Sequence, residues 1–207
     1  KAAEKAGEVY AEDCGRGNLN FGDETTGDYF LQRRKELEVI DEIHHEVNEY
    51  PGARAAMVMM DLGTDWREVA PTALRDTEST VKALQHFEGP QDTLKHFYCD
   101  NAPEFKAACT QLQIINPTST PAVPETNGIA ENGVKEAKQG ITCNMFQSGF
   151  ERSWWEAAGT CWCFQRNIVP QTRWSGDTKE SAYQRRHSVS CKAQLIPFGG
   201  MVEFMKT

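Results

Sequence analysis

The sequence predicts an α/β domain with a mixed sheet, and three observations carry this prediction. Residues 55–60 (AAMVMM) form a continuous apolar run of strand length, as expected for a strand covered on both faces. After this run, strand-like and helix-like patterns alternate along the chain. The chain has 207 residues, of which 39% are hydrophobic, so it is long enough to bury one sizeable core.

The N-terminal part is expected to contain a lead-in and three strands. Residues 1–20 are polar and rich in small side chains, which is typical of a linker. Residues 25–33 are a strand candidate, and residues 36–50 are a charged insertion between this strand and the apolar run. Residues 66–71 are predicted to pair back on the apolar run after the turn at residues 63–65.

The central part is expected to alternate helix and strand. Residues 77–88 show helical spacing of apolar positions, and residues 94–99 are predicted to form a short strand that leads into Asp100. Residues 104–112 are predicted to be helical and to be followed by a short strand at residues 113–116. Residues 117–124 are a loop, because no helix can cross their prolines.

Two helices are expected to close the core. The first follows Asn127, where apolar residues recur at helical spacing, and the second covers residues 150–168 and is more apolar. Residues 21–168 are therefore predicted to be the folded core. Residues 169–207 are predicted to be a C-terminal extension that begins a small β element.

Composition limits the partners. The net charge is −8 and the pI about 5.2, which disfavours DNA binding by the chain as a whole but is compatible with a local basic face. The basic cluster at residues 185–187 is equally typical of a DNA-backbone contact and of a solvated turn. The seven cysteines contain no CxxC pair, so reduced thiols are expected rather than a zinc site or a disulfide framework. No stretch approaches the ~20 apolar residues of a membrane span.

Three carboxylates fall where separate elements could bring them together. Asp28 lies in the first predicted strand, Asp100 follows the strand at residues 94–99, and Glu131 lies one turn into a helix. None of the three has an evident basic neighbour in sequence, so together they would repel one another without cations. Carboxylate oxygens are ligands that Mg²⁺ and Mn²⁺ prefer. With 30 acidic residues in the chain, the pattern alone has low specificity.

Other carboxylates lie close to these positions in the sequence. Asp23 competes with Asp28, but residues five apart on a strand face opposite sides, so both cannot reach one metal cluster. Glu136 competes with Glu131, but it lies about 140° away around the helix. Asp61 ends the apolar run and is interpreted as a turn or capping residue.

Five segments resemble integrases of retroviruses and retrotransposons. Residues 100–105 (DNAPEF) and 121–131 (PAVPETNGIAE) are similar to the segments around the second and third acidic residues of the D,D-E motif. Residues 57–66 (MVMMDLGTDW) are similar to the second strand and its turn. Residues 181–187 and 195–199 resemble the segment that follows copia-type cores.

The resemblance implies a ribonuclease H-like fold with a five-stranded mixed sheet flanked by helices. It also implies an enzyme that processes DNA 3′ ends and joins them to target DNA with two Mg²⁺ or Mn²⁺ ions. Asp28, Asp100 and Glu131 would be the catalytic residues and the metal ligands.

The partners implied by the resemblance are the element's DNA ends, target DNA and further copies of the chain, with no membrane and no small-molecule substrate. Lys135 and Lys138 share a helix face with Glu131 and would contact DNA, and Asn127 would contact DNA from the preceding turn. The expected location is the nucleus or a cytoplasmic particle.

Departures from the family pattern keep two other functions open. Ala102 replaces the usual glycine, Glu125 the usual glutamine and Asn132 a common arginine. The loss of the glutamine and of the arginine removes potential contacts with DNA. His44 and His45 have no cysteine pair after them, so no His-His-Cys-Cys zinc module is expected within this segment. The alternatives are a ribonuclease H-type nuclease and a catalytically inactive nucleic-acid-binding or interaction remnant of a retroelement.

Overall fold

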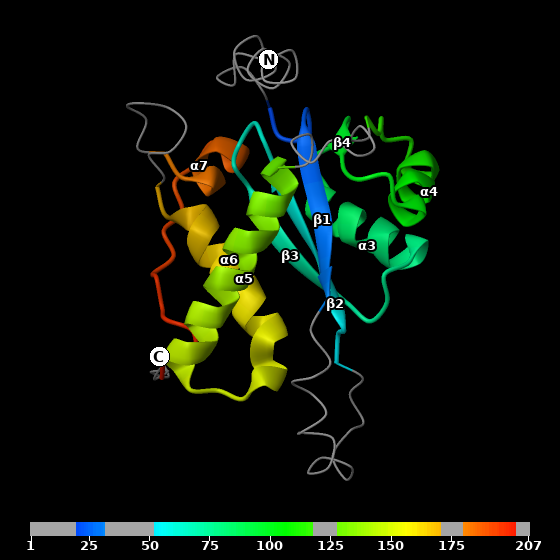
Figure 1. The fold of residues 1–207 in the computed structure, drawn as a ribbon. Coiled ribbons are helices and arrows are strands. Elements are labelled where there is room, and N and C mark those ends of the chain that lie inside the picture. Colours follow the sequence, from blue (N-terminus) through cyan, green and yellow to red (C-terminus); the bar gives the residue numbers. More distant parts are fainter. Residues whose placement is uncertain (1–19, 32–51, 118–127, 171–179, 202–207) are drawn as a thin grey trace, which may run out of the picture.

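A computed structural model describes residues 20–31, 52–117, 128–170 and 180–201. Within them, a four-stranded mixed sheet in the order β3-β2-β1-β4 lies between two layers of helices (Figure 1). The strands are β1 (Thr25–Leu31), β2 (Ala55–Asp61), β3 (Arg67–Thr72) and β4 (Phe97–Tyr98). The predicted α/β class and mixed sheet are confirmed.

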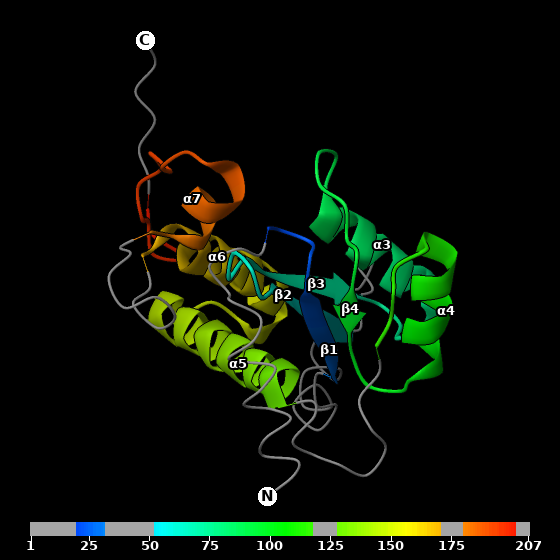
Figure 2. The ribbon, with the colours of Figure 1, turned by 90° about the horizontal axis from the view of Figure 1, so that it is seen from above.

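The helices cover both faces of the sheet (Figure 2). Helices α3 (Thr77–Glu88) and α4 (Pro103–Leu112) cover one face, and α5 (Gly128–Ser148) and α6 (Trp155–Ile168) cover the other. A 3-10 turn, η4 (Arg152–Trp154), leads into α6, and the short helix α7 (Ala182–His187) packs beside α6. None of the described helices is long and apolar enough to cross a bilayer.

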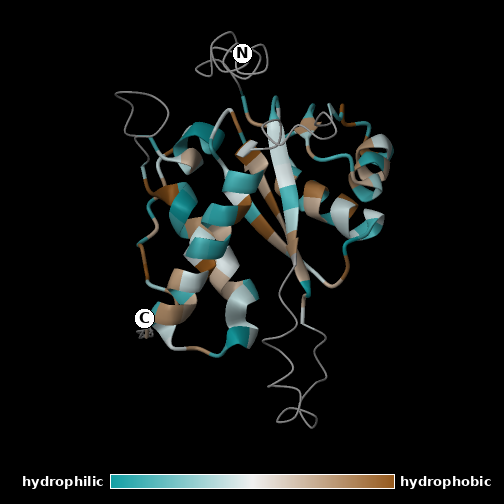
Figure 3. Ribbon diagram, viewed as in Figure 1, coloured by the Kyte–Doolittle hydropathy of each residue, from teal (hydrophilic) through white to brown (hydrophobic). Residues whose placement is uncertain are grey.

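The two faces of β2 supply two separate cores. Met57 and Met59 pack under α3 and α4, whereas Val58 packs under α5 and α6. Both faces are covered, so all seven residues of β2 are buried, as the unbroken apolar run predicts. In Figure 3 brown, hydrophobic segments lie on the strands behind β1, whereas teal, hydrophilic segments recur along the visible side of α5.

The predicted strand count of five is not confirmed among the described residues. The strand expected at residues 113–116 is a single parallel bridge between His96 and Ile115. The reason is local, because Gln113 adopts a left-handed conformation with φ of 59° at the C-cap of α4. Ile114 then donates its backbone N–H to the Cys109 carbonyl, so residues 113 and 114 still belong to the end of the helix and only Ile115 pairs with the sheet. The insertion at residues 36–50 lies outside the described residues.

Gly27 in β1 is packed too closely to accept a side chain. A Cβ atom there would lie 2.7 Å from the Val58 carbonyl oxygen and 2.9 Å from Cζ of Phe97. We expect Gly27→Ala to lower the free energy of unfolding by ~1–3 kcal/mol, measured by urea denaturation. The matched control is Gly133→Ala in α5, where a Cβ would meet nothing within 4 Å. That helical substitution should raise stability by roughly 0.5–1 kcal/mol, and equal effects of the two would contradict the packing argument.

Candidate active site

The parallel pairing of β1 with β4 brings Asp28 and Asp100 close together. Thr26 pairs with Tyr98, and Asp28 and Asp100 each follow two residues later in their own segments. Parallel segments advance at the same rate, so this register places the two aspartates at the same level of the sheet. Consistent with this placement, the negative charge of Asp100 raises the pKa of Asp28.

Glu131 approaches the same place from the helical layer. Asp28 shares a strand face with Phe30, which packs under α5 and α6, so the Asp28 side chain is directed toward that layer. Glu131 is exposed in the first turn of α5, and its charge also raises the pKa of Asp28. Two of the three carboxylates predicted from sequence, Asp100 and Glu131, therefore act electrostatically on the third, Asp28.

The burial and the neighbouring negative charges of Asp28 would favour the binding of a cation. Partial burial is the largest cause that raises its pKa, and the backbone N–H of Tyr29, 2.6 Å from Oδ1, opposes this by stabilising the charged form. Asp100 and Glu131 raise the pKa further, while Arg75 lowers it. A partly desolvated carboxylate beside two like charges is stabilised by an added positive charge.

The donor chemistry fits a hard divalent cation, but the side chains do not converge on one point. No three His, Cys, Asp or Glu side chains of the described residues stand where they could hold one metal ion. Asp100 is engaged instead with the backbone N–H of Ala102, 3.0 Å from Oδ1, and with Arg75. In this arrangement the carboxylate of Asp100 faces Ala102 and Arg75 rather than a point shared with Asp28 and Glu131.

Arg75 is the site residue that sequence reasoning missed. Its Nη2 lies 3.7 Å from Oδ2 of Asp100, and its Nε donates to Glu104. The guanidinium also lies over the ring of Tyr29, with its Cζ 5.4 Å from the ring centroid. Asp100 has no basic neighbour in sequence, but the fold brings Arg75 to it from the connection between β3 and α3.

The two rival carboxylates have partners elsewhere. Asp23 lies before β1 and forms an ion pair of 2.6 Å with Lys95, which is the main reason that the pKa of Asp23 is lowered. Glu136 accepts a hydrogen bond from Arg67 on β3. Neither is a partner in the electrostatic group around Asp28.

The residues predicted to contact DNA are only partly described. Lys135 and Lys138 are both exposed on α5. Nζ of Lys138 lies 5.3 Å from the centroid of the Phe30 ring, two residues along β1 from Asp28. This contact holds the ammonium group of Lys138 against β1. Asn127 lies outside the described residues.

Comparison with known proteins identifies the fold through solved structures. No family model matches the sequence, and no curated protein matches it. The chain is similar to the HTLV-2 integrase catalytic core domain in complex with magnesium, in a dimeric form with 14% identity and a TM-score of 0.54. The trimeric form gives 15% identity and a TM-score of 0.57. In both cases the match covers 82% of this chain and 99% of the other.

A third similar structure is a chain from the simian T-cell lymphotropic virus intasome in complex with the PP2A regulatory subunit B56 gamma. Identity is 16%, the TM-score is 0.60, and the match covers 100% of this chain and 73% of that chain. At such identities the likeness concerns the fold. The described sheet and helices therefore form an α/β fold similar to that of retroviral integrase catalytic cores.

Proposed function

We propose that this chain is the catalytic core of a copia-type retrotransposon integrase, which processes DNA 3′ ends and joins them to target DNA. One observation carries the proposal. Asp100 and Glu131, which lie in the segments that resemble the D,D-E motif, are electrostatic neighbours of Asp28 on the adjacent strand, within an integrase-like fold. The similar HTLV-2 core is a complex with magnesium, which supports Mg²⁺, or Mn²⁺ in its place, as the cofactor.

In this proposal the three carboxylates serve as ligands for two divalent ions. When bound, such ions supply an activated water or 3′-hydroxyl and stabilise the leaving oxygen. Asp100 would turn from Arg75 toward the cations, while Arg75 would keep its contact with Glu104. Tyr29 would continue to orient Asp28 through its backbone N–H.

The DNA would lie along the exposed flank of α5 next to this group. Lys135 and Lys138 would contact phosphates, and Asn127 would contact DNA from the segment before α5. These local charges would provide affinity that the net charge of −8 does not. Further copies of the chain are proposed as partners, in the nucleus or in a cytoplasmic particle, because similar cores are described as dimers, trimers and intasomes.

A catalytically inactive nucleic-acid-binding or interaction role is the second candidate. The pairing of Asp100 with Arg75 and the acidic charge of the chain favour it. A ribonuclease H-type nuclease shares the implied fold, and cleavage of RNA–DNA hybrids would distinguish it from an integrase.

The direct test is a Mn²⁺-dependent nicking and strand-transfer assay that compares the wild type with Glu131→Gln. We expect both activities in the wild type and neither in the variant, because the neutral amide is a much poorer cation ligand. Folding of both proteins is checked by circular dichroism. A folded wild type that is inactive even with an upstream zinc module supplied would support the non-catalytic role.

A further inference from the structure

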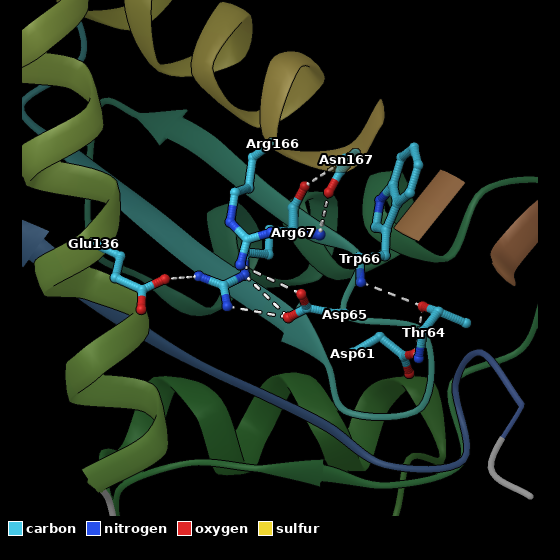
Figure 4. Close-up of polar contacts among 8 residues, drawn as sticks. All are labelled: Asp61, Thr64, Asp65, Trp66, Arg67, Glu136, Arg166 and Asn167. Carbon is cyan, nitrogen blue, oxygen red and sulfur yellow. Dashed lines mark hydrogen bonds and ion pairs between the residues drawn. The ribbon is translucent and has the colours of Figure 1, made fainter. Parts of the chain in front are cut away.

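A cluster of charges that is buried around Arg67 and Asp65 and half-buried at Glu136 connects β3 and α6 to the helix that carries Glu131 (Figure 4). Arg67 at the start of β3 is at its centre, and its side chain is only 4% exposed. Its Nε and Nη2 donate to Oδ1 of Asp65 at 3.3 and 3.0 Å, and its Nη1 donates to Glu136 on α5. Nη2 of Arg166 lies 3.4 Å from the other oxygen of Asp65.

The backbone of Arg67 is fixed as firmly as its side chain. The amide of Asn167 on α6 accepts the Arg67 N–H at 3.0 Å and donates to the Arg67 carbonyl at 2.8 Å. Asn167 therefore occupies the outer edge of β3, where a neighbouring strand would otherwise pair. Because Asn167 fixes the backbone of Arg67 and Asp65 fixes its guanidinium, Arg67 can hold Glu136, and with it α5, in one position relative to β3.

The cluster of Arg67, Asp65 and Glu136 is not explained by its contribution to the free energy of unfolding alone. Removing ions from water is expensive, and exchanging a buried ion pair for apolar side chains of similar size is often neutral or stabilising. Asp65 also adopts a left-handed backbone conformation, with φ of 62°, which costs about 1 kcal/mol for a residue with a side chain. The ion pair between Arg67 and Glu136 supplies a directional contact between α5 and the sheet, which an apolar contact would not supply.

The first half of α5 needs such a contact because its fully buried residues are all small, and the larger Val134 beside them is only partly buried. Ala130, Gly133 and Ala137 are buried there, and such small side chains interlock little with their neighbours and so hardly oppose rotation of the helix about its axis. In the second half, Ile141 fills space and Asn144 donates to the carbonyl of Ala158 at 3.1 Å.

Helix geometry links Glu136 to Glu131. The two residues are ~7.5 Å apart along the axis and about 140° apart around it, so they lie on opposite flanks of the buried stripe. Glu136 reaches β3 on one flank. Glu131 lies on the other flank together with Lys138, seven residues further along, whose Nζ lies 5.3 Å from the centroid of the Phe30 ring on β1. We propose that Arg67 and Glu136 are positioning residues that set the rotation of α5 and thereby the approach of Glu131 to Asp28 and Asp100. The role at the carboxylates rests on the proposed function.

The test compares three variants of the whole chain with the wild type. Arg67→Met with Glu136→Met removes the pair without leaving a buried charge unpaired, since Asp65 keeps Arg166. Glu136→Gln keeps an acceptor for Arg67 and is the conservative variant. Asn144→Leu removes the directional contact at the far end of α5 and is the matched control. Mn²⁺ affinity is measured by titration calorimetry, and α5 protection by hydrogen exchange.

We expect the double variant to bind Mn²⁺ at least ~10-fold more weakly, the scale typical of losing support around a metal ligand. Its amides at positions 131–138 should exchange faster, with little change at 141–148. Glu136→Gln should keep the wild-type Mn²⁺ affinity and the wild-type exchange at 131–138. Asn144→Leu should exchange faster at 141–148 with little change at 131–138, and its Mn²⁺ affinity should be unchanged.

Two results would overturn the inference. Unchanged exchange at 131–138 in the double variant would show that the pair does not orient α5. Faster exchange there with unchanged Mn²⁺ affinity would show that the rotation of α5 does not affect the carboxylates. If the wild type binds no Mn²⁺, the proposed metal chemistry fails, and the exchange pattern alone then decides whether Arg67 and Glu136 orient the helix.

Discussion

Replacing Asp100 by asparagine is expected to abolish metal-dependent DNA nicking, with a loss of ~10³-fold or more. Asparagine preserves the size of the side chain and the acceptor for the Ala102 N–H, so the local turn should survive. The variant removes one negative ligand oxygen, and metal ions contribute several kcal/mol to charge stabilisation in this kind of transition state. Nicking of a labelled DNA substrate in Mn²⁺ measures the loss.

The matched control is Glu104→Gln, which removes the other carboxylate paired with Arg75. Glu104 does not belong to the proposed ligand set, so this variant should keep most of the nicking activity. The pair between Asp100 and Arg75 is partly exposed and contributes little to stability, so Asp100→Asn should unfold at nearly the wild-type temperature. Nicking that persists in Asp100→Asn would remove Asp100 from the active site.

Patterns that depend on neighbours in sequence predict most of the fold. The apolar run at β2 and the helical spacing at α3 each give the observed element, because burial on one or two faces dictates those patterns. Helix α7 is not among the predicted elements, since it is short and polar. Ser181 accepts from the Gln184 N–H, so a capping pattern of serine followed three residues later by glutamine is the signal that could have found it.

Contacts between distant segments could not be predicted. The basic cluster at residues 185–187 is expected on the surface, but the guanidinium of Arg186 lies over Phe21 with its Cζ 3.7 Å from the ring centroid. The same group lies over Trp66, and its side chain is 8% exposed. Arg186 therefore joins α7 to the core. Such a placement, like that of Arg75 beside Asp100, depends on tertiary structure that no local pattern encodes.

Asp61 shows how a residue close to a motif can act through structure alone. It ends β2 and is fully buried. Its Oδ1 accepts from the Gly22 N–H at 2.9 Å, and its Oδ2 accepts from the N–H and hydroxyl of Thr64 at 2.7 and 2.6 Å. These contacts confirm the turn or capping role that the sequence predicts. Asp61 joins the chain before β1 to the turn between β2 and β3.

Asp61→Ala is therefore expected to lower the free energy of unfolding by about 3–5 kcal/mol, because it leaves two backbone N–H groups and a hydroxyl buried without an acceptor. That is a large fraction of the stability of a typical domain, so the variant is expected to be only marginally folded. Urea denaturation measures the loss. The control is Glu78→Ala, which removes an exposed carboxylate paired with Lys82 and should have a far smaller effect.

The stability lost in Asp61→Ala is expected to depend on pH in a definite direction. Burial is the main cause that raises the pKa of Asp61 above its ordinary value, and the hydrogen bonds from Thr64 and Gly22 oppose it only in part. The folded chain therefore holds this proton to a higher pH than the unfolded chain does, and the protonated group contributes stability that is fully present below the unfolded pKa. That contribution is lost as the pH rises through the folded pKa. The difference in unfolding free energy between wild type and Asp61→Ala should consequently be larger at about pH 4 than at about pH 7. A difference that grows toward neutral pH would mean that the hydrogen bonds outweigh burial and that the pKa of Asp61 is lowered instead.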